Sequence, residues 1–276
     1  MMDNQIPGAT TWHVACVASD KNHLDCLAEA FNHPNTRVDT FYIPDETSMP
    51  NFSGSPHKVV VEWLDGSEDM KFEGLSFMSG LMDKKTLFLS ASLAFLPSEL
   101  AYVLPNPAML VGFDPIPFLF QKRTTTVAPA LQTSLRTQRT LRSFFEKIEM
   151  PVHWIQETPG MVMPRIYAML ANEAAFAVQH GIATVKDIDT AMTLGTNYPM
   201  GPLAWADKVG LRVVYTILQY CWETYRDDRY RPSLLLYRLM GAGQTFYQYH
   251  RHQHEQAEAA SRLSVVGSGS SDDDDL

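Results

Sequence analysis

The segment from 158 to 207 predicts helix boundaries more clearly than any other part of this chain, because it contains glycines and capping residues. Apolar residues recur at helical spacing over residues 166–177, which predicts a long helix with one buried stripe. Gly181 stands where that helix should stop. Thr184 is the predicted N-cap of the next helix, with Asp187 three residues on as an approximate capping box. The segment therefore predicts a turn, a long helix, a short loop and a second helix.

The same segment resembles the C-terminal domain of the short-chain 3-hydroxyacyl-CoA dehydrogenases, because several unusual residue groups occur in the same order. The matching groups are Pro-Gly at 159–160, Arg165, Asn-Glu-Ala at 172–174, Asp-Ile-Asp-Thr-Ala-Met at 187–192, Pro-Met-Gly-Pro at 199–202, and Asp207 before Gly210-Leu211. Residues 231–235 and 246–249 resemble the closing segment of that family. The resemblance implies a helical domain that forms a homodimer contact, an acyl-CoA-like ligand and the cofactor NAD(H).

Upstream of this segment, short apolar runs alternate with amphipathic stretches. Strands are expected over residues 12–18, 37–43, 58–64, 86–92, 109–113 and 152–155, and helices over residues 24–31, 72–82, 97–103 and 131–148. Strands that alternate with helices favour a doubly wound, mostly parallel sheet. The expected fold class is therefore an α/β N-terminal domain with a degenerate Rossmann-like parallel sheet, followed by an all-α C-terminal domain.

The expected domain organisation has four parts. They are a flexible N-terminus over residues 1–11, the Rossmann-like domain over 12–157, the helical domain over 158–262 and a disordered acidic tail over 263–276. A chain of 276 residues with 45% apolar composition can bury two cores. The formal net charge of −9 argues against a surface for nucleic acid or anionic membrane. Three scattered cysteines and the lack of an apolar run long enough to span a membrane favour a cytoplasmic protein.

The turn after the first expected strand contains no glycine. A dinucleotide site needs glycines there, so that the backbone turns tightly and lets the pyrophosphate approach the helix N-terminus. Here the turn reads Ser19-Asp20-Lys21-Asn22-His23, and Asp20 would place a negative charge beside the pyrophosphate. Ser19 and Asp20 are nevertheless the positions that would face a cofactor, and Asp45 could contact a ribose. A surface aspartate after Pro44 is the commoner explanation of Asp45.

The catalytic groups implied by the resemblance are also replaced. The family uses a serine, a histidine that acts as general base, a glutamate that orients the histidine, and an asparagine. The corresponding positions are occupied by Ala91, Val111, Arg123 and Pro164. Valine cannot accept a proton, so the usual base is absent. The neighbouring groups that could substitute are Ser90, Ser92 and Asp114.

Cations and histidines give weaker indications. Lys122, Arg123 and Arg165 could bind the phosphates of a ligand such as coenzyme A, although surface cations are common. Arg136, Arg139 and Arg142 recur three apart on one expected helix, where an exposed face is favoured over an anion site. His250, His252 and His254 alternate in a segment that nothing orients, so a solvated tail is favoured and no metal site is expected.

Three functional hypotheses follow. The chain is a 3-hydroxyacyl-CoA dehydrogenase-like protein of acyl-CoA or fatty-acid metabolism that cannot use the family's His–Glu mechanism. One alternative is a non-catalytic dimeric acyl-CoA-binding or scaffold protein, which the simultaneous loss of the glycine turn, His, Glu and Asn supports. Another is a divergent NAD(P)-dependent oxidoreductase with replaced catalytic groups. A different substrate on the same fold also stays open, because fold does not determine function.

Overall fold

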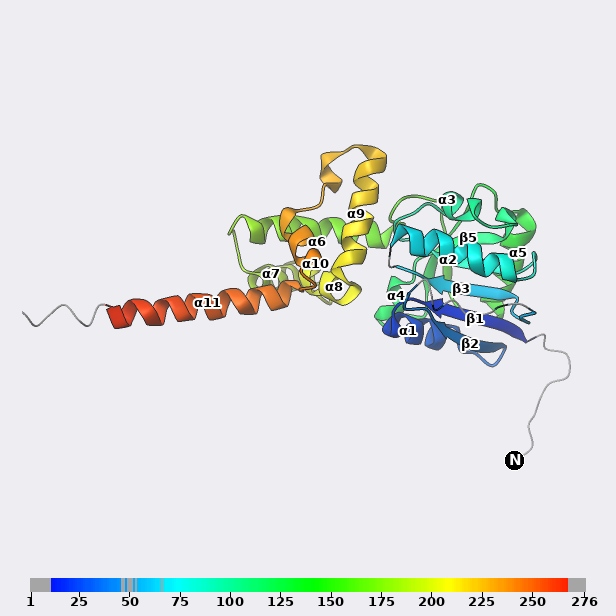
Figure 1. Ribbon diagram of the computed structural model, residues 1–276, viewed down its shortest axis with the longest axis horizontal. Coiled ribbons are helices and arrows are strands. Elements are labelled where there is room, and N and C mark those ends of the chain that lie inside the picture. Colours follow the sequence, from blue (N-terminus) through cyan, green and yellow to red (C-terminus); the bar gives the residue numbers. More distant parts are fainter. Residues whose placement is uncertain (1–10, 46–47, 49–51, 53, 66, 268–276) are drawn as a thin grey trace, which may run out of the picture. The chain divides into compact units, whose positions relative to one another are not determined.

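The computed structural model describes residues 11–45, 48, 52, 54–65 and 67–267 (Figure 1). The chain divides into two compact units. The first contains the chain up to Arg165 together with Tyr220–Arg226, and the second contains Ile166–Gln219 and the chain from Asp227 onward.

The first unit is built on one sheet with strand order β2-β1-β3-β4-β5-β6-β7. The strands are β1 (Trp12–Ala18), β2 (Thr36–Tyr42), β3 (Val59–Trp63), β4 (Leu87–Ala91), β5 (Leu110–Phe113), β6 (Thr125–Pro129) and β7 (Val152–Trp154). Neighbouring strands pair in parallel except for β5 and β6, which are antiparallel. Because β1 lies between β2 and β3, the strand order reverses beside β1. In open α/β sheets this switch point, at the carboxyl ends of the strands, is where ligands bind.

Helices cover both faces of this sheet. They are α1 (Lys21–Phe31), α2 (Glu68–Leu81), α3 (Pro97–Tyr102), α4 (Ile116–Leu119) and α5 (Leu135–Lys147). One buried cluster joins α2 and α3 to strand residues such as Ala15 and Val60. The other face is packed by aromatic rings of α1, α4 and α5, with the Phe31 ring 5.9 Å from that of Phe118 and 6.2 Å from that of Phe144.

The second unit is helical. The helices that lie in it wholly or in part are α6 (Met163–Gln179), α7 (Val185–Thr196), α8 (Pro202–Val209), α9 (Leu211–Tyr225), α10 (Leu234–Gly241) and α11 (Phe246–Gly267). The predicted cap of α7 is confirmed, because Thr184 Oγ1 accepts from the Asp187 backbone N–H at 3.2 Å. Gly181 follows the end of α6 and has φ +68°, the left-handed conformation that commonly ends a helix.

The predicted fold class is confirmed in both of its parts, an α/β sheet domain followed by helices. In the sheet domain, the short helix α4 and the strand β6 were not predicted. Helix α2 starts earlier than the expected 72–82, because Ser67 Oγ accepts from the Met70 N–H at 3.0 Å and caps it. The expected lead-in at 1–11 and tail at 263–276 lie mostly outside the described residues. Among the described helices, none has the length and apolarity needed to cross a membrane.

Candidate functional site

The turn between β1 and α1 is closed by an acidic side chain. Asp20 has an extended backbone, and its Oδ1 accepts from the His23 backbone N–H at 3.0 Å, so this carboxylate is the N-cap of α1. The N-terminus of a helix carries partial positive charge and free N–H groups, which is why it can hold phosphate. Here the carboxylate of Asp20 already occupies that position.

A second carboxylate lies at the carboxyl end of β3, on the other side of the switch point. Asp65 Oδ1 accepts from Ser19 Oγ at 2.7 Å, and Asp65 Oδ2 lies 3.1 Å from His23 Nδ1. The His23 ring stacks on Trp63 with centroids 3.8 Å apart and planes 1° apart. Burial would raise the pKa of Asp65, but the hydrogen bond and charge of His23, with Ser19 and Lys71, outweigh it and lower the pKa. Asp65 is therefore ionised at neutral pH.

The residues at this switch point do not fit a nicotinamide dinucleotide held in the usual way. The pyrophosphate needs glycine backbone and helix N–H groups. It would instead meet the carboxylates of Asp20 and Asp65, while His23 and Trp63 fill the neighbouring space with stacked rings. Asp45, the ribose candidate, is exposed after β2 and accepts from Ser48 Oγ at 2.9 Å.

A buried ion pair lies between β3, α2 and β4. Lys71 Nζ contacts Glu62 Oε1 at 2.6 Å and Oε2 at 2.9 Å, and it donates to the Ala91 carbonyl at 2.8 Å. Glu62 also accepts from Ser90 Oγ and from the Leu64 N–H. Burial lowers the pKa of Lys71, although the charge of Glu62 opposes this. Ser90 therefore donates its hydroxyl proton to a structural carboxylate.

The two residues that the sequence resemblance aligns with the family's serine and histidine lie in the sheet. Ala91 is the last residue of β4 and Val111 is a buried residue of β5. Ser92 Oγ donates to the Ser90 carbonyl at 3.1 Å. Ser92 Oγ also packs against Gly112, where an added Cβ would lie only 2.5 Å from Ser92 Oγ. The loop after β4 is therefore fitted closely against the backbone of β5.

Asp114 follows β5 and is buried. Its Oδ1 accepts from the Ile116 N–H at 2.9 Å. Burial raises the pKa of Asp114 to about 7, against the opposing effect of that hydrogen bond. Asp114 is thus a carboxyl group at the carboxyl edge of the sheet that can both hold and release a proton near neutral pH.

The candidate phosphate-binding cations have different environments. Arg123 donates Nε to the Ala30 carbonyl at 2.9 Å and Nη1 to the Glu149 carbonyl at 3.1 Å, so it ties the end of α1 to the segment after α5. Lys122 is exposed. Arg165 Nη1 lies 3.3 Å from Thr158 Oγ1. Pro164 is in the first turn of α6.

Sequence reasoning did not find the contact of His23 with Asp65 or the ion pair of Glu62 with Lys71. His23 and Asp65 lie on separate elements, and only the sheet brings them together. Glu62 sits in an apolar run that predicts a strand, where a charged residue is a signal of a buried partner. In the described part of the chain, His, Cys, Asp and Glu side chains form no cluster of three or more that could hold a metal.

Comparison with known proteins gives the family. The model of the 3-hydroxyacyl-CoA dehydrogenase C-terminal domain matches residues 160–249. A probable 3-hydroxybutyryl-CoA dehydrogenase of Deinococcus radiodurans is 30% identical over 201 residues, which are 69% of this chain and 71% of that protein. The chain belongs to the 3-hydroxyacyl-CoA dehydrogenase family. A similar protein of Bacillus subtilis, also a probable 3-hydroxybutyryl-CoA dehydrogenase, is 29% identical and covers 69% of each chain.

The family fold is also evident from solved structures. The crystal structure of (S)-3-hydroxybutyryl-CoA dehydrogenase from Ralstonia eutropha superimposes with a TM-score of 0.67 at 20% identity, covering 84% of this chain and 94% of that one.

The family motifs in the second unit have structural roles. Asp189 accepts from the Leu203 N–H at 2.9 Å, the Ala204 N–H at 2.8 Å and the Tyr247 hydroxyl at 3.0 Å, so one carboxylate joins three motif segments. Asn172 accepts from the Ser233 N–H at 2.8 Å and donates to the Arg231 carbonyl at 2.9 Å. These hydrogen bonds give both residues a structural role within the helical unit.

Proposed function

We propose that this protein is a member of the 3-hydroxyacyl-CoA dehydrogenase family that binds an acyl-CoA-type ligand and does not transfer hydride to or from NAD. The observation that carries the proposal is the Asp20 carboxylate on the N-terminus of α1, where the pyrophosphate of a dinucleotide would have to bind. The protein would act in acyl-CoA or fatty-acid metabolism in the cytoplasm, as a homodimer through its helical unit.

Electrostatics support the loss of cofactor binding. Two like charges 4 Å apart repel by about 1 kcal/mol in water and about 4 kcal/mol near a protein surface. A pyrophosphate carries two charges and would meet both Asp20 and Asp65. At a glycine-rich turn, the N–H groups of the helix N-terminus attract the pyrophosphate. The difference in binding free energy between such a turn and this acidic one is therefore larger than the repulsion alone.

The replaced base supports the loss of hydride transfer. Proton removal from a hydroxyl needs a group whose pKa lies near the working pH. By the sequence resemblance, Val111 stands at the position of the family's histidine; it is buried, and Ser90 donates its proton to Glu62. The acyl-CoA ligand is inferred from the relatives, which are 3-hydroxybutyryl-CoA dehydrogenases by name.

A second candidate function is a divergent oxidoreductase of the same family. One observation favours it, because the pKa of Asp114 is raised to about 7 by burial and so suits a general base at the carboxyl edge. It would require a cofactor that approaches the sheet by a route other than the turn after β1.

Calorimetric titration separates these functions. The purified protein is titrated with NADH and, separately, with acetoacetyl-CoA, alongside the Deinococcus radiodurans relative as a positive control. We expect no NADH binding up to millimolar concentration and saturable binding of acetoacetyl-CoA. Micromolar NADH binding, or NADH oxidation by acetoacetyl-CoA that Asp114→Asn abolishes, would establish the second candidate. Failure of both ligands to bind would remove the acyl-CoA part of the proposal.

A further inference from the structure

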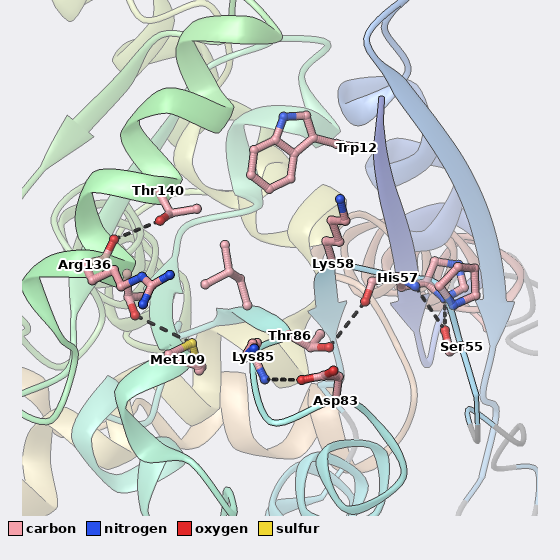
Figure 2. A pocket seen from close by; sticks show the side chains of 13 residues that line it. Trp12, Ser55, His57, Lys58, Asp83, Lys85, Thr86, Met109, Arg136 and Thr140 are labelled. Atoms are coloured by element: carbon pink, nitrogen blue, oxygen red, sulfur yellow. Dashed lines mark hydrogen bonds between the residues drawn. The ribbon is translucent and has the colours of Figure 1, made fainter. Parts of the chain in front are cut away.

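A pocket of about 500 Å³ lies at the amino edge of the sheet, at the opposite ends of the strands from the candidate site (Figure 2). Trp12 begins β1, Lys58 precedes β3, Thr86 precedes β4 and Met109 precedes β5. Helix α5 supplies Arg136 and two threonines. Pockets that bind small molecules have volumes of about 300–1,000 Å³, so the space suits a small ligand.

The charges around this pocket are mostly positive. Lys58, Lys85 and Arg136 line it, whereas the acidic residue in its lining is Asp83. The Asp83 carboxylate accepts from the Lys85 backbone N–H at 2.8 Å. Within the described part of the chain, the charged ends of the three cations have no hydrogen-bond or ion-pair partner. In a chain with a net charge of −9, three unpaired cations around one depression indicate an anion site.

The wall between the cations is apolar. The half-buried Trp12 indole forms part of it and is held by an edge contact to Phe144, with ring centroids 5.1 Å apart. Leu87, Met109 and Pro56 contribute further apolar surface. Pockets for organic ligands combine such apolar walls with a few charged groups that orient the ligand.

Hydrogen bonds fix the walls in place. His57 is buried, with Nε2 2.8 Å from Asp39 Oδ2 and Nδ1 in contact with Ser55 Oγ. Thr137 Oγ1 donates to the Ala108 carbonyl at 2.7 Å. Because these side chains are already ordered, the entropy cost of binding a ligand is lower.

We propose that this pocket binds a small organic anion, with its apolar or aromatic body against Trp12 and Met109 and its negatively charged group at Lys58, Lys85 and Arg136. The site lies entirely within the first unit and does not depend on the proposed function. Carboxylates and phosphates share the required chemistry, because both accept charge-assisted hydrogen bonds from lysine and arginine.

A matched pair of probes tests the charge requirement. The full-length protein is titrated calorimetrically with 2-naphthoate and with the uncharged 2-naphthamide. We expect saturable binding of the naphthoate and binding of the amide that is at least about fivefold weaker, since the amide cannot use the cations. If neither 2-naphthoate nor 2-naphthyl phosphate binds more tightly than the amide, or if neither anion saturates at about 10 mM, the proposal is overturned. A third titration with 2-naphthyl phosphate identifies the preferred anionic group, and tighter binding of either anion than of the amide supports the site.

Paired variants locate the binding. Lys85→Gln and Arg136→Gln remove lining cations, whereas Lys84→Gln and Arg139→Gln remove exposed neighbours outside the lining. All four side chains are exposed, so the variants are expected to fold. Each lining variant should weaken 2-naphthoate binding by about two- to fivefold, the range of one exposed ion pair, and each control should leave it unchanged. An equal effect of lining and control variants would mean that only the overall charge matters and would overturn the site.

Discussion

The fully buried carboxylate of Glu62 is stabilised by three donors, an ammonium group, a hydroxyl and a backbone N–H. Lys71 supplies the countercharge, and Ser90 Oγ and the Leu64 N–H supply hydrogen bonds. An ion taken out of water loses several kcal/mol of solvation, which a close partner restores only with good geometry. The pair therefore holds β3, α2 and β4 in one arrangement, and its role is structural.

Lys71→Met should destabilise the protein by about 3–5 kcal/mol, because it leaves the Glu62 carboxylate buried without a countercharge. Urea unfolding followed by circular dichroism measures the change. The double variant Glu62→Leu/Lys71→Met should be less destabilised than the single one, since no buried charge remains. Lys84→Met, at an exposed position, is the control and should lie within about 0.5 kcal/mol of the original protein. A Lys71→Met protein as stable as this control would contradict the structural role of the pair.

Asp114 should make stability depend on pH. Burial raises its pKa in the folded state to about 7, whereas an unfolded aspartate has a pKa near 3.9. Between those two values the folded protein keeps a proton that the unfolded chain loses. The stabilisation is therefore complete below about pH 4 and is lost as the pH rises to about 7, by a total of about 2–4 kcal/mol.

The measurement is urea unfolding at pH 5 and pH 8 for the original protein and Asp114→Asn. Asparagine keeps the acceptor for the Ile116 N–H but cannot ionise. Relative to Asp114→Asn, the original protein should be less stable at pH 8 than at pH 5. A difference between the two proteins that stays constant with pH would show that Asp114 does not titrate in this range.

At the scale of elements, the joint between α7 and α8 depends on a close approach. The Asp189 carboxylate caps α8 through Leu203 and Ala204, and Gly201 allows it to come near enough. A Cβ at Gly201 would lie 2.2 Å from Asp189 Cγ, which no packed structure accepts. Gly201 is thus required by space, since its φ of −68° is open to any residue.

Gly201→Ala should therefore cost about 2–4 kcal/mol, the sum of overpacking and a disturbed helix cap. Gly195→Ala is the matched control. Gly195 lies in α7, where an added Cβ meets nothing within 4 Å, so alanine should stabilise the helix by up to about 1 kcal/mol. Thermal unfolding of the two variants checks the signs. Similar unfolding temperatures for both would show that Asp189 can move away from the new methyl group.

The elements differ in how far local sequence predicts them. The apolar run of β1 and the cap at Thr184 are local signals, and the structure confirms both. Strand β6 is short, ends at Pro129 and pairs antiparallel with β5, so its formation depends on a neighbour that the local sequence does not reveal. Helix α4 is a single turn that contains Pro117, and it begins after the Asp114–Pro115 turn.

For the molecule as a whole, the sequence reveals the absence of expected site residues more readily than the contacts and pockets that the fold forms. The absent glycines and the valine at position 111 are visible in the residues themselves. The contact of His23 with Asp65, and the amino-edge pocket, exist only because parallel strands bring distant segments to one edge of the sheet. Contacts between segments far apart in the chain have no characteristic sequence spacing, so a single sequence does not predict them.

Ligand linkage provides a test on the whole molecule. A ligand that binds only the folded state stabilises it by about 2.7 kcal/mol at a concentration of 100 times its Kd. For a chain of this size each kcal/mol raises the unfolding temperature by about 2–4 °C. Saturating acetoacetyl-CoA should therefore raise the unfolding temperature by about 5–10 °C, whereas millimolar NADH should leave it unchanged, because Asp20 and Asp65 repel the pyrophosphate.

Differential scanning calorimetry is the appropriate measurement, since a chain of two units can unfold in more than one transition. The transition that shifts with acetoacetyl-CoA belongs to the part of the molecule that binds it. Adenosine 3′,5′-bisphosphate controls for a general effect of phosphate and should give a smaller shift than the acyl-CoA, because it lacks the acyl chain. An upward shift with NADH that Asp20→Lys enlarges would mean that the dinucleotide does reach the turn after β1, and that the Asp20 carboxylate weakens its binding without preventing it.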